Sequence, residues 1–382
     1  MSARTSKGWG IAITARATYL KPWYEGFAAA QPSGWTTHIL LPEDTPHAHP
    51  RELTTPVYPS LHQHEIHVRK QERSNDTTPA ATHFGRQFTW MPDRGMLRIL
   101  RSLNLYGFII HEFSPFTLAA LLHARMRSLP VVSFSDVGRD NAASFPLKTR
   151  LWHAFWSLAI DARMAGCPAA RVPVSGSRLA AIDSFHAVDC AEFVPKAKPP
   201  QQPTTFVFSG QLIQRKGLDL WFRAASRLRV EVGDIFRLRV LGGGDEAWAK
   251  RSASQAGIES LVEWCGFLQR DAMKEALGTA DVFVLPSRFD SYAAVVHEAA
   301  CLGLPLLVSR HAGAAEALVR EGVNGFTIDP QDTAAFASQM KLFLDPNRRS
   351  SLGNAARATG EAFCARRRGR AVWEWITQQF PL

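Results

Sequence analysis

FVFSGQLIQRKGLDL (206–220) opens the part of the chain that decides the fold. An apolar run that ends at a glycine and continues into a helical pattern predicts a buried strand, a tight turn and a helix. The same alternation returns in LRVLGGGDE (238–246), ADVFVLPSRFDSYAAVVHEAACLGLPLLVS (280–309) and HAGAAEALVREGVNGFTIDP (311–330). Strands that alternate with helices predict an α/β fold with a doubly wound parallel sheet.

The first half of the chain repeats this alternation. We expect strands at 10–15, 37–42, 105–113 and 131–136, and a strand that continues into a helix over 171–182. We expect helices at 21–30, 114–130 (capped by Ser114) and 147–165. Residues 43–92 are rich in Pro, His and Thr, which predicts long loops around a strand or two.

In the second half, helices are expected at 216–230, 246–256, 271–280, 293–301, 332–360 and 365–380. The segment AEFVPKAKPPQQP (191–203) is rich in Pro and Lys and has no periodicity, so we place a linker there. This gives a first domain over 1–190, a second domain over 204–360 and a C-terminal helix over 361–382 that crosses back to the first domain. Open parallel sheets bind ligands at the carboxyl ends of their strands.

Composition limits the classes of function. The 46% hydrophobic and 20% charged fractions are typical of a globular protein, and no apolar run is long enough to predict a membrane span. The N-terminal segment lacks the features of a signal peptide, so we expect a cytoplasmic protein. The net charge is +10, and seven of these charges fall in residues 1–203. Without a nucleic-acid-binding motif, this excess indicates an anionic membrane or acceptor rather than nucleic acid.

Aromatic residues beside basic ones in the helix expected at 147–165 leave two interpretations open. Trp152, Phe155 and Trp156 lie near Lys148 and Arg150, as in helices that rest on an anionic membrane. The same residues also suit a buried helix whose first turn is basic.

Neither the cysteines nor the histidines predict a metal site. The five cysteines are scattered without a CxxC pair, so we interpret them as small buried apolar residues. His62, His64 and His67 lie in a polar segment, which favours a solvated loop. We therefore expect neither a metal nor a cofactor.

In order and spacing, the four segments quoted first resemble the nucleotide-sugar half of retaining GT-B glycosyltransferases of the family 4, or group 1, type. This resemblance implies two Rossmann-like domains that face a central cleft. It also implies transfer of a sugar from a nucleoside-diphosphate sugar to a glycan or lipid-linked acceptor, with retention and without a metal ion. The leaving diphosphate would help to deprotonate the acceptor.

The family pattern G-R-L-x-x-x-K-G assigns the diphosphate contacts. Gly210 and Lys216 match it, and Gln211 stands where the family has Arg. Lys216 would supply the main positive charge for the diphosphate, because neutral Gln211 cannot. Arg215 either adds charge there or lies in solvent.

The family's E-x7-E signature corresponds to Asp290 and Glu298, with Asp in the first position. By resemblance, Glu298 accepts hydrogen bonds from the ribose hydroxyls and Asp290 from the donor sugar. The loop whose backbone N–H groups meet the pyrophosphate comprises Ser291, Tyr292, Ala293 and Ala294, with Ala293 where the family usually has Gly.

Two further segments complete the expected donor site. Gly242 and Gly244 resemble the family's Gly-rich loop and would line the nucleotide pocket. Phe267 and Leu268 stand where the family holds the base, although core packing explains them equally well.

In the first domain many relatives place a catalytic histidine at a strand end, where this chain has Ser135 and Asp136. Asp136 would then contact the sugar or acceptor, or else His111, Glu112 or Arg139 would. We take Asp136 and His111, with Lys216 and Asp290, as the catalytic candidates.

Two alternatives stay open: a sugar-nucleotide epimerase on the same fold, and a nucleotide-sugar-binding protein that has lost activity. A phosphorylase is disfavoured because we find no lysine site for pyridoxal phosphate.

Overall fold

The computed structural model of the chain describes residues 7–13, 21–42, 61–72, 88–92, 94–111, 114–138, 142, 145–195 and 203–381. The chain forms two compact units, Met1–His186 with Ala365–Leu382, and Ala187–Cys364. Of the expected linker, residues 191–195 belong to the second unit and 196–202 lie outside the described residues. Each unit is considered by itself.

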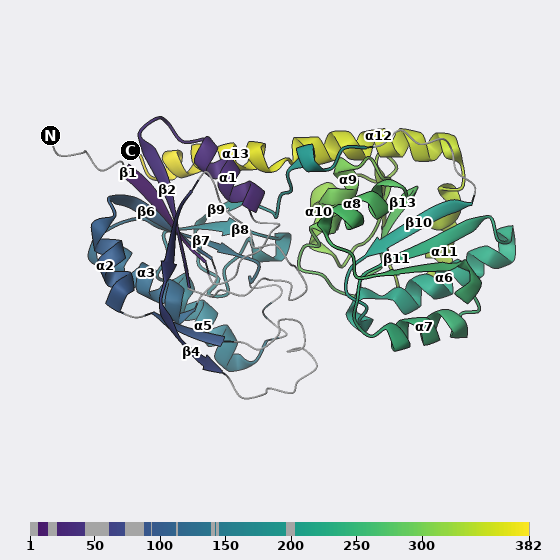
Figure 1. Cartoon of the computed structure of the whole chain (residues 1–382), viewed down its shortest axis with the longest axis horizontal. Helices are drawn as coiled ribbons and strands as arrows, with labels where there is room; N and C mark the ends of the chain where they lie inside the picture. Colours follow the sequence, from purple (N-terminus) through teal and green to yellow (C-terminus); the bar gives the residue numbers. More distant parts are fainter. Residues whose placement is uncertain are drawn as a thin grey trace. The chain divides into compact units, whose positions relative to one another are not determined.

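The first unit, as far as it is described, is built on a seven-stranded parallel sheet in the order β3-β2-β1-β6-β7-β8-β9 (Figure 1). Its strands are β1 (Lys7–Ala12), β2 (Trp35–Pro42), β3 (His62–Ile66), β6 (Leu105–His111), β7 (Val131–Ser135), β8 (Ala162–Ala165) and β9 (Ala180–Asp183). Strands β4 (Val68–Glu72) and β5 (Phe88–Pro92) pair separately as an antiparallel ribbon. The helices are α1 (Lys21–Ala29), α2 (Arg94–Ser102), α3 (Pro115–Met126), α5 (Leu147–Ser157) and α13 (Ala365–Gln379).

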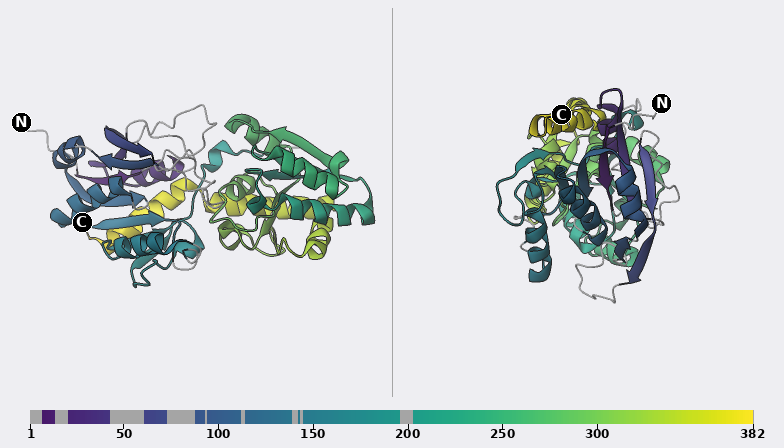
Figure 2. Two further views of the ribbon diagram at one scale, coloured as in Figure 1. Left: turned by 90° about the horizontal axis from the view of Figure 1, so that it is seen from below. Right: turned by 90° about the vertical axis from the view of Figure 1, so that its left-hand side faces the viewer.

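Alternation along β2 shows how this sheet is covered on both faces. Ile39 and Leu41 pack in the core cluster that α1 and α13 complete, whereas Leu40 packs in the cluster with α2 and α3. The C-terminal helix α13 lies in the first unit (Figure 2), where small residues let it pack closely on α1. A Cβ at Gly369 would lie 2.1 Å from the backbone carbon of Gly26.

The first half departs from the sequence prediction at three places. Residues 162–165, expected at the end of a long helix, form the buried strand β8. This strand pairs with β7 on one side and β9 on the other, and that pairing outweighs the local helical periodicity. The helix expected within 171–182 is absent from these described residues, and only β9 forms there. Helix α2 was not predicted. Ser114 caps α3 as expected, in a capping box with Thr117.

The described second unit has a six-stranded parallel sheet in the order β12-β11-β10-β13-β14-β15. The strands are β10 (Thr204–Ser209), β11 (Phe236–Leu241), β12 (Val262–Gly266), β13 (Val282–Leu285), β14 (Leu306–Ser309) and β15 (Gly325–Ile328). The helices are α6 (Leu218–Val232), α7 (Glu246–Gln255), α8 (Arg270–Gly278), α9 (Val295–Cys301), α10 (Gly313–Leu318), α11 (Thr333–Leu342) and α12 (Pro346–Ala362).

This unit follows the predicted alternation, with shifted ends. Helix α6 begins two residues later than expected, the stretch 332–360 is divided into α11 and α12, and α10 was not predicted. Strand order reverses between β10 and β13, which lie side by side although about 75 residues separate them. In open α/β sheets such a reversal marks the ligand site, at the carboxyl ends of the two strands.

Candidate functional site

Two loops leave the carboxyl ends of β10 and β13 and touch at Gly217. The first forms a 3-10 turn over Gln214–Lys216 and ends at Gly217, whose φ is 71°. A Cβ at Gly217 would lie 2.0 Å from the carbonyl oxygen of Pro286 in the second loop. Both the left-handed backbone and this close approach require glycine. Gly210 has no such backbone requirement and lies half-buried beside Lys216.

The Lys216 ammonium forms an ion pair with the Asp290 carboxylate, and these side chains are only 12% and 10% exposed. Arg215 Nη1 lies 3.8 Å from the same carboxylate oxygen and donates a hydrogen bond to the Phe289 carbonyl at 2.7 Å. Arg215 is therefore part of the site rather than a solvated charge. Because both charges are shielded from water, removing either one would leave the other as an uncompensated buried charge.

A second ion pair, not predicted from the sequence, fastens the two loops. Arg288 donates two hydrogen bonds to the Asp219 carboxylate at 2.8 and 2.7 Å, and one to the Gln214 carbonyl at 2.7 Å. The backbone N–H of Arg288 also donates to the Arg215 carbonyl at 2.8 Å. Arg288 and Asp219 are 69 positions apart, and no sequence pattern connects them.

The loop after Asp290 is held by backbone hydrogen bonds to the start of α10. The N–H of Asp290 donates to the His311 carbonyl at 3.0 Å, and the Asp290 carbonyl accepts from Gly313 at 3.1 Å. Ala293 has a φ of 71°, where a non-glycine residue costs about 1–2 kcal/mol. This strain falls at the position where the resemblance leads one to expect glycine.

The remaining residues of this segment differ in burial. Tyr292 is buried, whereas Ser291 and Ala294 are half-buried. Glu298 lies in the first turn of α9 and is 7% exposed. A carboxylate this buried requires polar partners, and Glu298 does have an interaction of this kind.

The glycine-rich turn after β11 lies against the turn after β10. A Cβ at Gly242, whose φ is 139°, would lie 1.8 Å from the Gly210 carbonyl oxygen. Leu212 and Gly244 form a bridge between the same turns. Gly242 therefore brings two predicted donor-binding segments into direct contact.

A cavity of about 300 Å³ opens beside these turns. Its lining comprises Leu212, Gly242, Glu246, Lys250, Trp264, Cys265 and Gly266. Phe267 and Leu268, expected to hold the base, are half-buried and do not line this cavity. Trp264, Cys265 and Gly266, which come just before them at the end of β12, line it instead. The prediction was therefore wrong by one to three positions, a shift that a sequence pattern cannot resolve.

In the first unit, Asp136 and His111 lie at the carboxyl ends of neighbouring strands. The Asp136 carboxylate accepts from His186 Nε2, at 3.1 and 2.9 Å to its two oxygens. His111 stacks on Phe134 with ring centroids 4.3 Å apart. His186 was not predicted, because it follows β9 in a stretch without a motif. Glu112 and Arg139 lie outside the described residues.

The protonation of this cluster follows from its surroundings. Burial alone would raise the pKa of Asp136, but the charge and hydrogen bonds of His186 outweigh it and lower that pKa. Burial lowers the pKa of His111 to about 3, so its imidazole is neutral at physiological pH. Its buried Nε2 has no hydrogen-bond partner among the described residues, a feature that a ligand or water would complete.

We expect Asp136→Asn to reduce the free energy of unfolding at pH 7 by about 1–3 kcal/mol, the cost of losing hydrogen bonds to a charged group. Because the folded pKa lies below the unfolded one, this stabilisation is present above the unfolded pKa and is lost as pH falls through the folded value. Urea unfolding at pH 7 and in acid measures it. Asp183→Asn, which removes a more exposed ion pair with Arg171, is the control. Equal losses in both variants at pH 7 would contradict this role of Asp136.

The histidines interpreted as a solvated loop lie instead on or next to the edge strand β3. His64 Nε2 is 3.1 Å from His38 Nδ1 on β2, and burial lowers the pKa of His38 to about 4. Within the described residues, the group whose side chains lie close enough together to hold a metal ion is a different one, Cys190, His297 and Cys301.

No described helix is sufficiently long and apolar to cross a membrane.

The model of the family described as glycosyl transferases group 1 matches residues 191–359. A putative colanic acid biosynthesis glycosyltransferase, WcaL, of Escherichia coli K12 is 30% identical over 188 residues, which are 47% of this chain and 43% of that protein. The glycogen synthase of Mycobacterium tuberculosis H37Rv is 27% identical over 270 residues, 68% of this chain and 63% of that protein. The matched segments thus cover less than two thirds of these relatives.

Solved structures match nearly the whole chain. Sucrose-phosphate synthase from Thermosynechococcus elongatus has a TM-score of 0.68 at 14% identity and covers 98% of this chain and 99% of its own. Anabaena Alr3699/HepE in complex with UDP has a TM-score of 0.67 at 12% identity, with 98% and 100% covered. At such identities the likeness establishes the fold. Residues 191–359 are thus similar to the glycosyl transferases group 1 family, and the chain has the GT-B fold.

Proposed function

We propose that this protein transfers a sugar from a nucleoside-diphosphate sugar to a glycan or lipid-linked acceptor, with retention and without a metal ion. The observation that carries the proposal is the Lys216–Asp290 pair at the strand-order reversal of the second unit. A nearly buried cation beside a carboxylate suits a substrate that carries both a diphosphate and sugar hydroxyls.

Each group in the second unit then has a chemical role. Lys216, with Arg215 close by, holds the diphosphate and stabilises the charge that develops on it when the sugar leaves. Asp290 accepts a hydrogen bond from a hydroxyl of the donor sugar, and Glu298 accepts from the ribose. The cavity at Trp264 receives the base.

For the first unit, we propose that Asp136 and His111 contact the acceptor or the transferred sugar. The lowered pKa of Asp136 keeps it ionised, so it serves as a hydrogen-bond acceptor rather than as a strong base. The leaving diphosphate would take the acceptor proton. The UDP named in the HepE complex supports a nucleotide donor for this fold.

A panel of UDP-, GDP- and ADP-sugars tests the function. We expect slow hydrolysis of one donor by the wild-type chain, and release of a sugar whose first-formed anomer, observed by NMR, is that of the donor. The inverted anomer would contradict retention, and unchanged rates after chelation of metals would support metal independence. An epimerised donor without hydrolysis would favour the epimerase, and tight binding without turnover would favour the inactive binding protein.

We also propose that α5 rests on an anionic membrane. Leu147, Leu151, Phe155 and Leu158 form one stripe along it and are 61–70% exposed. Lys148 and Arg150 are exposed on the same helix, and their charges favour anionic lipid over another apolar surface. Trp156 instead packs in the core, whereas Trp152 and Phe155 are 38% and 62% exposed, so the three aromatic residues are divided between two environments.

Substituting glutamate for Leu151 and Phe155 together is expected to abolish flotation with vesicles that contain anionic phosphatidylglycerol. Burial of these apolar side chains in lipid is lost, and two negative charges are repelled by the surface. Val230→Glu is the matched control, since Val230 is an equally apolar, 87% exposed residue on α6. Flotation of the double variant at the wild-type level, or no flotation of the wild type, would refute the contact.

A further inference from the structure

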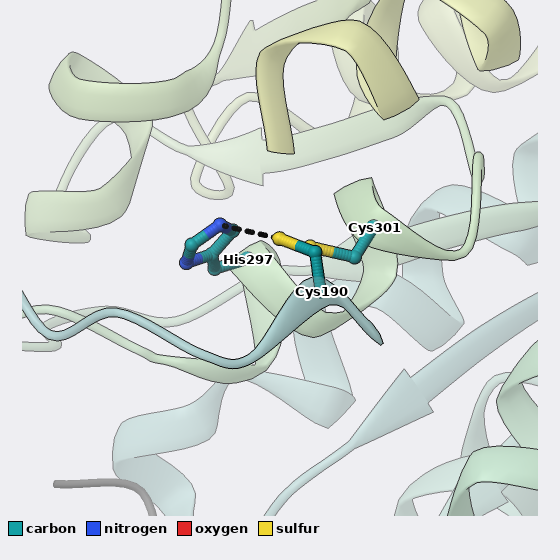
Figure 3. A group of neighbouring side chains, drawn as sticks. All are labelled: Cys190, His297 and Cys301. Atoms are coloured by element: carbon teal, nitrogen blue, oxygen red, sulfur yellow. Dashed lines mark hydrogen bonds between the residues drawn. The ribbon is translucent and has the colours of Figure 1, made fainter. Parts of the chain in front are cut away.

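A group of buried thiols in the second unit lies outside the proposed donor site. Cys190 Sγ and Cys301 Sγ are 2.7 Å apart, and His297 Nε2 lies 3.9 Å from Cys190 Sγ (Figure 3). The two cysteines are 111 positions apart in the chain. Cys190 begins the 3-10 turn Cys190–Glu192, and Cys301 ends α9. Both cysteines are free and buried, as the sequence predicts, but their contact with each other was not predicted.

The hydrogen bonds of His297 disfavour a metal ion at this place. Its Nδ1 accepts from the Val188 N–H at 3.3 Å, so the proton resides on Nε2, which donates to the Gly360 carbonyl at 2.8 Å. Both ring nitrogens are thus occupied by backbone groups. In addition, two thiolates on one tetrahedral zinc ion lie about 3.8 Å apart, because each Zn–S bond is about 2.3 Å. The observed separation is shorter.

The same contacts favour chemistry between the two sulfur atoms. The Cys301 thiol donates to Cys190 Sγ, and the Cys190 thiol donates a hydrogen bond to the Gly360 carbonyl at 3.2 Å. The hydrogen bond from Cys301, assisted by His297, outweighs burial and lowers the pKa of Cys190, while it raises the pKa of Cys301. Cys190 is the nucleophile of the pair and Cys301 the resolving thiol.

We propose that Cys190 and Cys301 form a reversible disulfide when the protein meets a peroxide. The Cys190 thiolate attacks one oxygen of hydrogen peroxide, forms a sulfenic acid and releases hydroxide, which takes up the proton of the original thiol as water. The Cys301 thiol then attacks the Cys190 sulfur, the S–S bond forms and a second water leaves. Two thiols and one peroxide give one disulfide and two waters, and a dithiol reductant reverses the reaction.

The bond would join the first residues of the second unit to the helix that carries Glu298. Because it closes a long loop, it restricts the unfolded chain and raises the unfolding temperature of that unit. This inference does not depend on the proposed transfer reaction, since mass and stability report it without a substrate.

Peptide mapping of the full chain after a peroxide titration tests the proposal. We expect a loss of two hydrogen atoms in mass, a linked peptide pair that contains Cys190 and Cys301, and a higher Tm that dithiothreitol reverses. Cys167 serves as an internal control: it is buried, its pKa is raised to about 12 chiefly by burial, and we expect it to stay reduced.

Cys301→Ser is expected to abolish the gain in Tm and to leave Cys190 as a sulfenic acid that dimedone labels, whereas Cys265→Ser keeps the full gain. If Cys301→Ser does not fold, the linked peptide in the wild type decides the matter. Differential alkylation that finds Cys190 and Cys301 as reduced as Cys167, or a stoichiometric zinc ion retained by the purified chain, would overturn the proposal.

Discussion

Lys216→Ala is expected to lower kcat/KM for donor turnover by about 100- to 1000-fold, the range seen when one preorganised charge-stabilising group is removed. The Lys216 side chain is 12% exposed and its ammonium pairs directly with Asp290, so water cannot replace it well. Most of the loss should fall in kcat, because charge on the diphosphate grows as the sugar departs. Steady-state hydrolysis and transfer assays with the preferred donor measure the effect.

Lys341→Ala is the matched control for this variant. Lys341 also forms an ion pair in the second unit, with Glu231, but both side chains are more than half exposed. Its removal should cost at most about 1 kcal/mol of stability and leave turnover unchanged. Combining Lys216→Ala with Asp290→Asn removes the uncompensated carboxylate, so it should regain stability without regaining activity. Wild-type turnover by Lys216→Ala would remove Lys216 from the site.

Gly217→Ala is expected to destabilise the second unit by about 3 kcal/mol or more and to abolish measurable donor binding. The left-handed backbone is unfavourable for alanine, and the new methyl group would lie 2.0 Å from the Pro286 carbonyl oxygen. To relieve this contact the loops that carry Lys216 and Asp290 must separate. Urea unfolding and calorimetric titration with a nucleoside diphosphate measure the two effects.

Gly257→Ala separates backbone strain from steric overlap. Gly257 has a similar φ of 67°, but an added Cβ meets nothing within 4 Å. This control should cost only about 1 kcal/mol, the strain of a left-handed alanine, and should bind nucleotide normally. Equal losses of stability in both variants would show that the contact between the two loops contributes nothing.

The second unit was more predictable from sequence than the first, for a physical reason. Its strands β10, β13 and β14 are largely apolar, and the loops that follow β10 and β13 carry the charged residues Lys216 and Asp290. The family resemblance assigned both residues to the donor, and parallel strands, which align their carboxyl ends, bring their two loops together. In the first unit, β8 reads as helix because its pairing partners are distant in sequence.

Contacts made by side chains could not be predicted in the same way. The Asp136–His186 and Cys190–Cys301 contacts join segments 50 and 111 positions apart, and neither has a spacing that a motif records. The Arg288–Asp219 ion pair is comparable, since only the fold brings a strand end and a helix start together. Gly217 falls in the first turn of the helix predicted over 216–230, but its approach to Pro286 depends on the packing of two loops.

Hydrogen–deuterium exchange with and without a nucleoside diphosphate tests most directly whether the second unit holds the donor. We expect slower exchange in three segments, residues 210–217, 242–246 and 286–298, and no protection of them in the Lys216→Ala variant. Protection confined to other segments, or identical protection in the wild type and in Lys216→Ala, would contradict it.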